Sequence, residues 1–238
     1  MIKLKKMQQT LKSISNIAKI LSERGWAEAN AGNISVNVSD AIGEEFDSSN
    51  FQKNSEDFGF LNNTSIIITS AGSRMRDIAI SAEKYCGILT FITGEKGYYI
   101  SKFGENEFVP TSEYLSHINI HKYLANSGRS EKAVVHSHPE ELIAAMHRED
   151  LNSEIKINSV FNSMHSEFSM LIPNKIGYIP FTEPGSKDLA DKTLKKLEDH
   201  NVVFWKNHGC ISIGDTLDLA LDNIEIVNKI AKIFFLQK

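Results

Sequence analysis

Two histidines separated by one residue, His136 and His138, close the apolar run in the stretch AVVHSHPEEL, which covers residues 133–142. If the run is a strand, side chains two residues apart point to the same face, at a spacing of roughly 6.7 Å. Both imidazoles could then bind one metal ion. The chain contains eight histidines, so an H-x-H pair can equally be two ordinary surface residues.

A catalytic zinc site usually has three protein ligands and an open fourth position. The segment WKNHGC, residues 205–210, offers His208 as the third, since it also ends an apolar run and is followed by Gly209, where the backbone can turn sharply. Strand ends that converge in one sheet would bring His208 to the other two. Three histidines with an open position suit Zn²⁺, and also Mn²⁺, Fe²⁺ or Co²⁺.

Glu113 follows Pro110, Thr111 and Ser112 and forms an i, i+4, i+8 stripe with His117 and His121. Such a stripe lies on one face of a helix. The stripe could be a second metal site or a solvent-facing polar surface, or Glu113 could be a carboxylate that reaches a metal-bound substrate and moves protons. The solvent-facing surface is the commonest outcome for a helix first turn. We expect the same surface position for His147 and His200.

Two small turns, NAGNIS (residues 30–35) and TSAGS (residues 69–73), lie next to expected strands. Turns of this composition can expose backbone N–H groups to a phosphate, although most are simply turns. Neither matches a nucleotide-binding glycine motif.

The elements that position these residues follow from hydrophobic periodicity. Strands are expected at residues 33–38, 64–70, 89–93, 97–101, 132–138, 175–181, 202–207 and 210–214. Helices are expected from the N-terminus to Gly25, at residues 77–86 and 110–128, from Pro139, at residues 186–199 and from Thr216. Thr111 or Ser112 is the expected N-cap of the third, and residues 40–63 read as a polar surface excursion. This order predicts a single α/β domain over residues 1–238, a sandwich with a mostly antiparallel central sheet flanked by helices.

Net charge, cysteine content and the length of apolar runs argue against a nucleic-acid-binding, secreted or membrane protein. A net charge of −4 gives no electrostatic surface for nucleic acid, but it does not exclude a small anionic ligand. Cys86 and Cys210 are far apart and form no disulfide framework, which favours a reducing compartment. The N-terminus has no signal-peptide pattern and no run of 18 apolar residues occurs, so we expect a cytoplasmic protein that does not interact with membranes.

Together the segments GWAEANAGNISV, IIITSAGS, VPTSE, VVHSHPEELIAA and KNHGCISIG occur in the order found in the class II aldolase/adducin family, which the chain resembles from about residue 10 onwards. Within it, VPTSE and HSEFSMLIPNKIGYIPF are most similar to the branch that cleaves L-rhamnulose 1-phosphate. The resemblance implies a class II, metal-dependent aldehyde-lyase. It also implies a homotetramer with sites at subunit interfaces.

The resemblance assigns roles to individual residues. It implies that His136, His138 and His208 hold one Zn²⁺ per chain, and that Glu113 is the acid/base with Glu167 as a second carboxylate near the metal. The implied phosphate site consists of Asn30, Gly32, Asn33, Gly72 and Ser112. Zinc chelated by the carbonyl and hydroxyl oxygens of the sugar would stabilise the enediolate left on dihydroxyacetone phosphate, with L-lactaldehyde as the second product.

Two features depart from the family. Ala71 stands where a serine or threonine usually precedes the glycine, so Ser70 or Ser73 would have to supply the hydroxyl. The chain ends at Lys238, before the C-terminal extension found in the rhamnulose branch. Without that extension, the resemblance does not define how the aldehyde half of the substrate is recognised. Alternatives are L-fuculose-phosphate aldolase, a pentulose-phosphate 4-epimerase, methylthioribulose-1-phosphate dehydratase, and a non-catalytic scaffold like adducin, which should lack the histidines and the glutamate.

Overall fold

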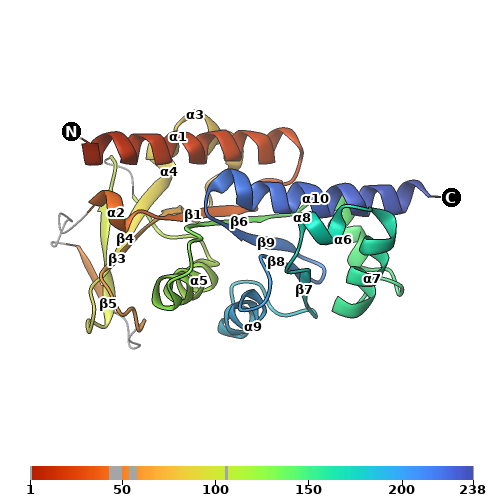
Figure 1. Ribbon diagram of the computed structural model, residues 1–238. Helices are drawn as coiled ribbons and strands as arrows, with labels where there is room; N and C mark the ends of the chain where they lie inside the picture. The colour runs from red at the N-terminus through yellow and green to blue at the C-terminus, as the bar shows by residue number, and fades with distance from the viewer. Residues whose placement is uncertain (1, 43–49, 54–57, 105–106, 238) are drawn as a thin grey trace.

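A computed structural model of the protein describes residues 2–42, 50–53, 58–104 and 107–237. Its strands are β1 (Asn33–Asn37), β2 (Phe51–Lys53), β3 (Thr64–Thr69), β4 (Cys86–Phe91), β5 (Gly97–Lys102), β6 (Ala133–Ser137), β7 (Ile176–Ile179), β8 (Val202–Trp205) and β9 (Gly209–Gly214). They form one sheet in the order β2-β5-β4-β3-β1-β6-β9-β8-β7 (Figure 1). All neighbours are antiparallel except β7 and β8. The predicted mostly antiparallel sheet is therefore confirmed.

Helices cover both faces of this sheet. They are α1 (Ile2–Glu23), α2 (Ser39–Ile42), α3 (Met75–Ile80), α4 (Ala82–Tyr85), α5 (Tyr114–Ser127), α6 (Glu140–Met146), α7 (Glu154–Met164), α8 (Phe168–Leu171), α9 (Lys187–Leu197) and α10 (Leu217–Leu236). Figure 1 shows α1 and α10 along one face and α5 and α9 on the other. The largest apolar core lies under α1 and α10, and two smaller cores lie under α5 and α9.

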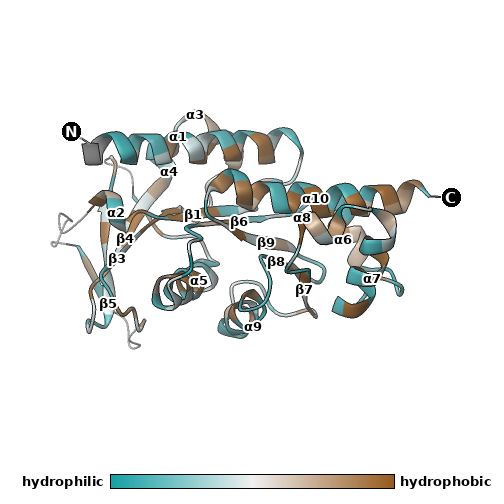
Figure 2. Ribbon diagram, in the orientation of Figure 1, coloured by the Kyte–Doolittle hydropathy of each residue, from teal (hydrophilic) through white to brown (hydrophobic). Residues whose placement is uncertain are grey.

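The long terminal helices owe their position to one apolar stripe each. In α1 the buried residues Ile14, Ile17 and Leu21 recur at helical spacing, and Figure 2 shows polar and apolar residues alternating along both α1 and α10. Thr216 caps α10, since its hydroxyl accepts the Leu219 N–H at 3.2 Å. No helix within the described residues is long and apolar enough to cross a membrane.

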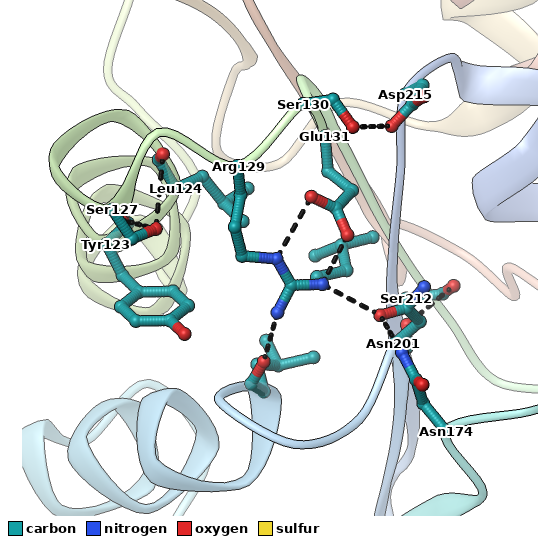
Figure 3. Close-up of polar contacts among 12 residues, drawn as sticks. Tyr123, Leu124, Ser127, Arg129, Ser130, Glu131, Asn174, Asn201, Ser212 and Asp215 are labelled. Carbon is teal, nitrogen blue, oxygen red and sulfur yellow. Dashed lines mark hydrogen bonds and ion pairs between the residues drawn. The ribbon is translucent and has the colours of Figure 1, made fainter.

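An ion-pair cluster anchors the chain where it enters the central strand β6 (Figure 3). Arg129 donates from Nε and Nη2 to the Glu131 carboxylate, from Nη1 to the carbonyl of Leu197 at 3.1 Å, and from Nη2 to Asn201 at 3.0 Å. The guanidinium thereby joins the end of α5, the start of β6 and the loop between α9 and β8. These bonds fix one end of the strand whose other end carries His136.

Several sequence-based boundaries need correction. The N-cap of α5 is Glu113, because the Thr111 carbonyl already accepts the Tyr114 N–H at 3.0 Å and closes a turn before the helix. Residues 40–63 are not only a surface excursion. They contain α2 and β2, and Phe58 and Phe60 are buried against Phe91, although residues 43–49 and 54–57 lie outside the described part. Helices α7 and α8 were not predicted.

Candidate metal and catalytic site

Three histidines from two strand ends meet at one point of the sheet. His136 lies in β6, His138 follows it, and His208 lies in the turn between β8 and β9. Their nearest ring nitrogens all lie within 4.8 Å of one another, as the ligands of a single ion would. They meet because β6 pairs with β9, which places Ser137 opposite Cys210 and sets the two turns side by side.

The hydrogen-bond partners of the Nδ1 atoms of His136 and His138 show which ring nitrogens remain available to bind a metal. His136 Nδ1 lies 2.8 Å from the carbonyl of Cys210, and His138 Nδ1 lies 2.9 Å from the carboxylate of Glu28. A carbonyl and a carboxylate can only accept, so in both rings the proton belongs on Nδ1. The two Nε2 atoms, 3.1 Å apart, then face each other with bare lone pairs. A shared cation is the natural partner of such a pair, and it relieves the repulsion between them.

Burial keeps His136 and His208 in the neutral form that binds metal. Desolvation lowers the pKa of His136 well below its ordinary value and lowers that of His208 to about 4. The Nδ1 atom of His208 is buried and finds no hydrogen-bond partner in the part of the chain that the structure describes. Burial works to raise the pKa of Glu28, but the hydrogen bond from His138, a backbone hydrogen bond and the nearby imidazoles together lower that pKa. The donor set therefore fits a divalent cation held by three imidazoles.

Local backbone conformation explains how His208 reaches this position. A Cβ at Gly209 would lie 2.3 Å from the carbonyl oxygen of Ser137 and 2.9 Å from His138 Cδ2. Only glycine lets β9 begin so close to the end of β6. The preceding Asn207 has a φ of +63°, a conformation that costs free energy in most non-glycine residues and is frequent at functional sites.

Glu113 places a carboxylate directly beside the histidines. Its oxygens lie 3.3 Å from His208 Nε2 and 3.5 Å from His136 Nε2. Burial raises the pKa of Glu113 to about 7, while a hydrogen bond from the Asn33 side chain acts against this. Oε2 of this carboxylate is buried without a hydrogen-bond partner among the described residues. A carboxyl group with this pKa can both take up and release a proton near neutral pH.

A cleft of about 320 Å³ contains this cluster. The residues that the resemblance assigned to a phosphate also line it, namely Asn30, Gly32, Asn33, Gly72 and Ser112. Gly32 and Gly72 adopt φ values of +76° and +73°, which the tight turns require. Ser70 and Ser73 were expected to supply the hydroxyl that Ala71 lacks. Both hydroxyls already donate to backbone carbonyls, Ser70 Oγ to Val109 O at 3.0 Å and Ser73 Oγ to Ser70 O at 2.6 Å.

One predicted site residue lies elsewhere. Glu167 is the exposed N-cap residue of α8 and does not line the cleft. Within one chain the structure therefore brings together Glu113, the three histidines and the turn residues, but not Glu167. Cys210 is fully buried, and it is its carbonyl, rather than its thiol, that contacts His136. Trp26 and Trp205 are buried, as expected of core residues.

The prediction that His117 and His121 lie on the surface is wrong. Both are completely buried, because α5 turns this face toward β1, where Ser35 lies between the two rings. Ser35 Oγ is 2.6 Å from His117 Nδ1 and 2.7 Å from His121 Nε2. His147 is exposed as predicted, and His200 is only partly buried. Sequence inspection also missed Glu28, for which no spacing rule gave a signal.

Comparisons with known proteins agree with this geometry. Residues 12–235 match the family described as Class II Aldolase and Adducin N-terminal domain. The rhamnulose-1-phosphate aldolase of Bacteroides thetaiotaomicron is 30% identical over 236 residues, which are 98% of this chain and 87% of that protein. The rhamnulose-1-phosphate aldolase of Escherichia coli is 28% identical over 217 residues, 88% of this chain and 78% of that protein.

Solved structures extend the likeness to three dimensions. A sugar-phosphate aldolase from Thermotoga maritima superposes with a TM-score of 0.83 at 29% identity, covering 98% of this chain and 97% of that one. An L-fuculose 1-phosphate aldolase superposes with a TM-score of 0.62 at 18% identity over 96% of this chain and 85% of that one. At that identity the second likeness concerns the fold alone.

Proposed function

This chain belongs to the class II aldolase and adducin family, as a metal-dependent aldehyde-lyase of the sugar-phosphate aldolase kind, and we propose that it cleaves L-rhamnulose 1-phosphate. The products are dihydroxyacetone phosphate and L-lactaldehyde, and the metal is Zn²⁺, about one per chain. Support for this substrate comes from the rhamnulose-1-phosphate aldolases that match most of the chain. Its predicted location is the cytoplasm.

A single observation supports the catalytic part of this proposal. The bare Nε2 atoms of His136 and His138 face each other, and Glu113 lies within 3.5 Å of His136 and 3.3 Å of His208. A cation ligand set and a proton-transfer group therefore share one cleft. When bound there, the cation supplies Lewis-acid stabilisation of the negative charge that develops on the ketone fragment.

The residues of the chain account for the remaining steps. The carbon–carbon bond beside the ketone breaks, and its electron pair stays with the three-carbon fragment. Glu113 takes the proton from the hydroxyl of the other fragment, whose oxygen becomes the aldehyde carbonyl. Glu113 returns a proton to the carbon that carried the broken bond, for which its raised pKa suits it. Held by the turns around Asn30, Gly72 and Ser112, the phosphate keeps the fragment in place, which lowers the entropic barrier.

We further propose a homotetramer in which a neighbouring subunit supplies Glu167 to the cleft. Glu167 is exposed and lies outside the cleft of its own chain. Large apolar side chains, including Ile80, Ile155 and Met170, are more than two-thirds exposed, which favours contacts with other subunits. Analytical ultracentrifugation tests the assembly. Refolding Glu113→Ala chains together with Glu167→Ala chains should restore activity if sites are shared, and should restore none if each chain acts alone.

The decisive experiment measures metal content and product release together. We would quantify bound metal in the purified protein and assay dihydroxyacetone phosphate release from L-rhamnulose 1-phosphate, with Glu113→Ala and His138→Ala alongside. The proposal expects about one zinc per chain and release that requires both residues.

Other outcomes redirect the assignment. Bound zinc without release would retain the site and move the substrate to L-fuculose 1-phosphate, another sugar phosphate, or to epimerisation or dehydration. Absence of both metal and release would overturn the catalytic role, leaving a scaffold.

A further inference from the structure

A chain of buried polar side chains runs from the catalytic carboxylate into the protein interior. Asn33 and Ser35 point to the same face of β1, and His117 and His121 lie one turn apart on α5. Asn33 contacts both Glu113 and His117, and Ser35 contacts both imidazoles. Ser35, His117 and His121 are completely buried and Asn33 is 5% exposed.

The direction of every hydrogen bond in this chain can be assigned. The Glu113 carboxylate only accepts, so the Asn33 amide presents its N–H₂ to it and its Oδ1 to His117. His117 Nε2 must then donate, which leaves its Nδ1 as the acceptor of the Ser35 hydroxyl. Ser35 Oγ in turn accepts the His121 Nε2–H. The remaining atom, His121 Nδ1, is an unprotonated acceptor that finds no partner among the described residues.

This assignment requires both imidazoles to be neutral with the proton on Nε2. Desolvation lowers the pKa of each to about 3, so neither is charged at neutral pH. Placing the unpaired end of the chain on an acceptor is the less costly arrangement, since a buried N–H without a partner is rarer and more unfavourable. The network is thus polarised in one direction, and it ends at Glu113.

A packing role alone does not explain these residues. The other buried positions of α5 are Ser116 and the apolar residues Ile118, Ile120 and Leu124. Apolar residues at 117 and 121 would avoid the desolvation of two imidazoles. A polar chain that is satisfied at nearly every atom fixes side-chain orientation more strictly than apolar packing does.

We propose that Ser35, His117 and His121 are positioning residues that lock the Asn33 amide and thereby hold the Glu113 carboxylate in its reactive orientation. None of the three contacts the cleft. Asn33, which was expected to bind phosphate, has both ends of its amide engaged in this task. The kinetic consequence of the inference rests on the proposed aldolase function.

The kinetic test uses Ser35→Ala, which removes the link between the two rings and little volume. We expect kcat to fall roughly 10- to 100-fold, the usual effect of losing such a supporting contact, while KM and bound zinc stay unchanged. The matched control is Ser65→Ala on β3. Ser65 is a buried serine whose hydroxyl bonds Thr90 at 2.9 Å, and it is not part of the network that reaches Glu113. It should lose similar stability and retain kcat.

Two comparisons separate positioning from general damage. His117→Gln can still donate to Asn33 and should retain more activity than His117→Leu. In a Glu113→Gln background, Ser35→Ala should have no further effect on the residual rate, because the carboxylate it orients is gone. Full additivity would overturn the proposal, as would a rise in KM at constant kcat in Ser35→Ala, which would instead indicate a phosphate contact of Asn33.

A spectroscopic measurement tests the network without any turnover. Histidine-selective ¹⁵N NMR of the intact protein should show His117 and His121 as neutral Nε2–H tautomers, with both signals shifted in Ser35→Ala and unshifted in Ser65→Ala. A proton on Nδ1 of His117 would contradict the assigned direction. If wild-type protein released no dihydroxyacetone phosphate, the proposed function would fail, and this measurement would still decide the inference.

Discussion

A glutamate lies near each end of strand β6, the half-buried Glu131 before its start and the buried Glu113 beside His136, and their electrostatic surroundings are opposite. At the entry, burial works to raise the pKa of Glu131, but the hydrogen bonds from two N–H groups of Arg129, a backbone hydrogen bond and the charge of Arg129 together lower that pKa. At the exit, Glu113 faces the imidazoles of His136 and His208 and makes no ion pair with a lysine or arginine among the described residues, and burial raises its pKa to about 7. The first end has its countercharge built into the chain, and the second is arranged for a countercharge that binds.

This contrast separates a structural ion pair from a functional one. The Arg129 guanidinium also donates to the Leu197 carbonyl and to Asn201 (Figure 3), so the cluster joins three segments through nearly complete hydrogen bonding. The exit end leaves Glu113 Oε2 and His208 Nδ1 without hydrogen bonds among the described residues. Such unsatisfied polar atoms lower stability, and we attribute their presence here to metal and substrate binding.

Glu113→Gln should produce the largest effect on activity. Loss of the acid/base group lowers kcat by roughly 10³-fold, while the free energy of unfolding of the protein stripped of metal should not fall, because a buried uncompensated charge is removed. The matched variant Glu131→Gln should do the reverse: it leaves Arg129 partly unpaired, lowers stability by roughly 2 kcal/mol and retains kcat. Steady-state kinetics and urea unfolding check both, and a stable, active Glu113→Gln protein would refute the comparison.

Metal removal tests the same contrast by changing the bound countercharge. A ligand present at a thousand times its Kd stabilises a protein by roughly 4 kcal/mol, which for a chain of this length corresponds to roughly 10 °C in Tm. We expect a chelator to lower Tm by about that amount in wild type and to have little effect in His138→Ala. An Arg129→Met protein should keep the full chelator response, because its altered end of β6 binds no metal.

How far the sequence predicted this site depended on the range of the interactions involved. The His136–His138 spacing and the glycine after His208 are local signals, and they pointed to three histidines that the structure brings together. The burial of His117 and His121 could not be predicted, because it depends on Ser35 facing them from a strand 80 or more residues away. The α5 pattern alone is equally compatible with a solvent-facing stripe.

Two further features were beyond local patterns for different reasons. Glu28 contacts His138 across 110 positions in the chain, and although it lies in the segment GWAEANAGNISV, no spacing rule relates it to the histidine. The aromatic pair Phe58 and Phe60 lies in a polar segment whose average composition hid two buried residues. Most strands, by contrast, could be predicted because their apolar runs were long enough to identify individually, but their order in the sheet was not predicted.

Arg129→Met addresses the entry end, with a smaller effect on stability than metal removal. The substitution leaves the Glu131 carboxylate without its cation and removes donors from Leu197 O and Asn201, so we expect the free energy of unfolding to fall by roughly 3 kcal/mol. Adding Glu131→Gln should recover part of this loss, since the unpaired charge disappears. Denaturant unfolding of the two variants measures the recovery. If the double variant were less stable than Arg129→Met, the pair's charge would not be the source of the cost.

Ser130→Ala should have the smallest effect, and it defines where the cluster ends. Ser130 lies between Arg129 and Glu131, and its hydroxyl donates to Asp215 at 2.8 Å in an exposed position. Water can replace this hydrogen bond at little cost, so we expect a loss of no more than about 0.5 kcal/mol. Urea unfolding of Ser130→Ala beside Glu131→Gln gives the measurement. A loss as large as that of Glu131→Gln would mean that the exposed Ser130–Asp215 hydrogen bond, rather than the ion pair of Arg129 with Glu131, stabilises this end of β6. The contrast between the two glutamates would then have no energetic basis.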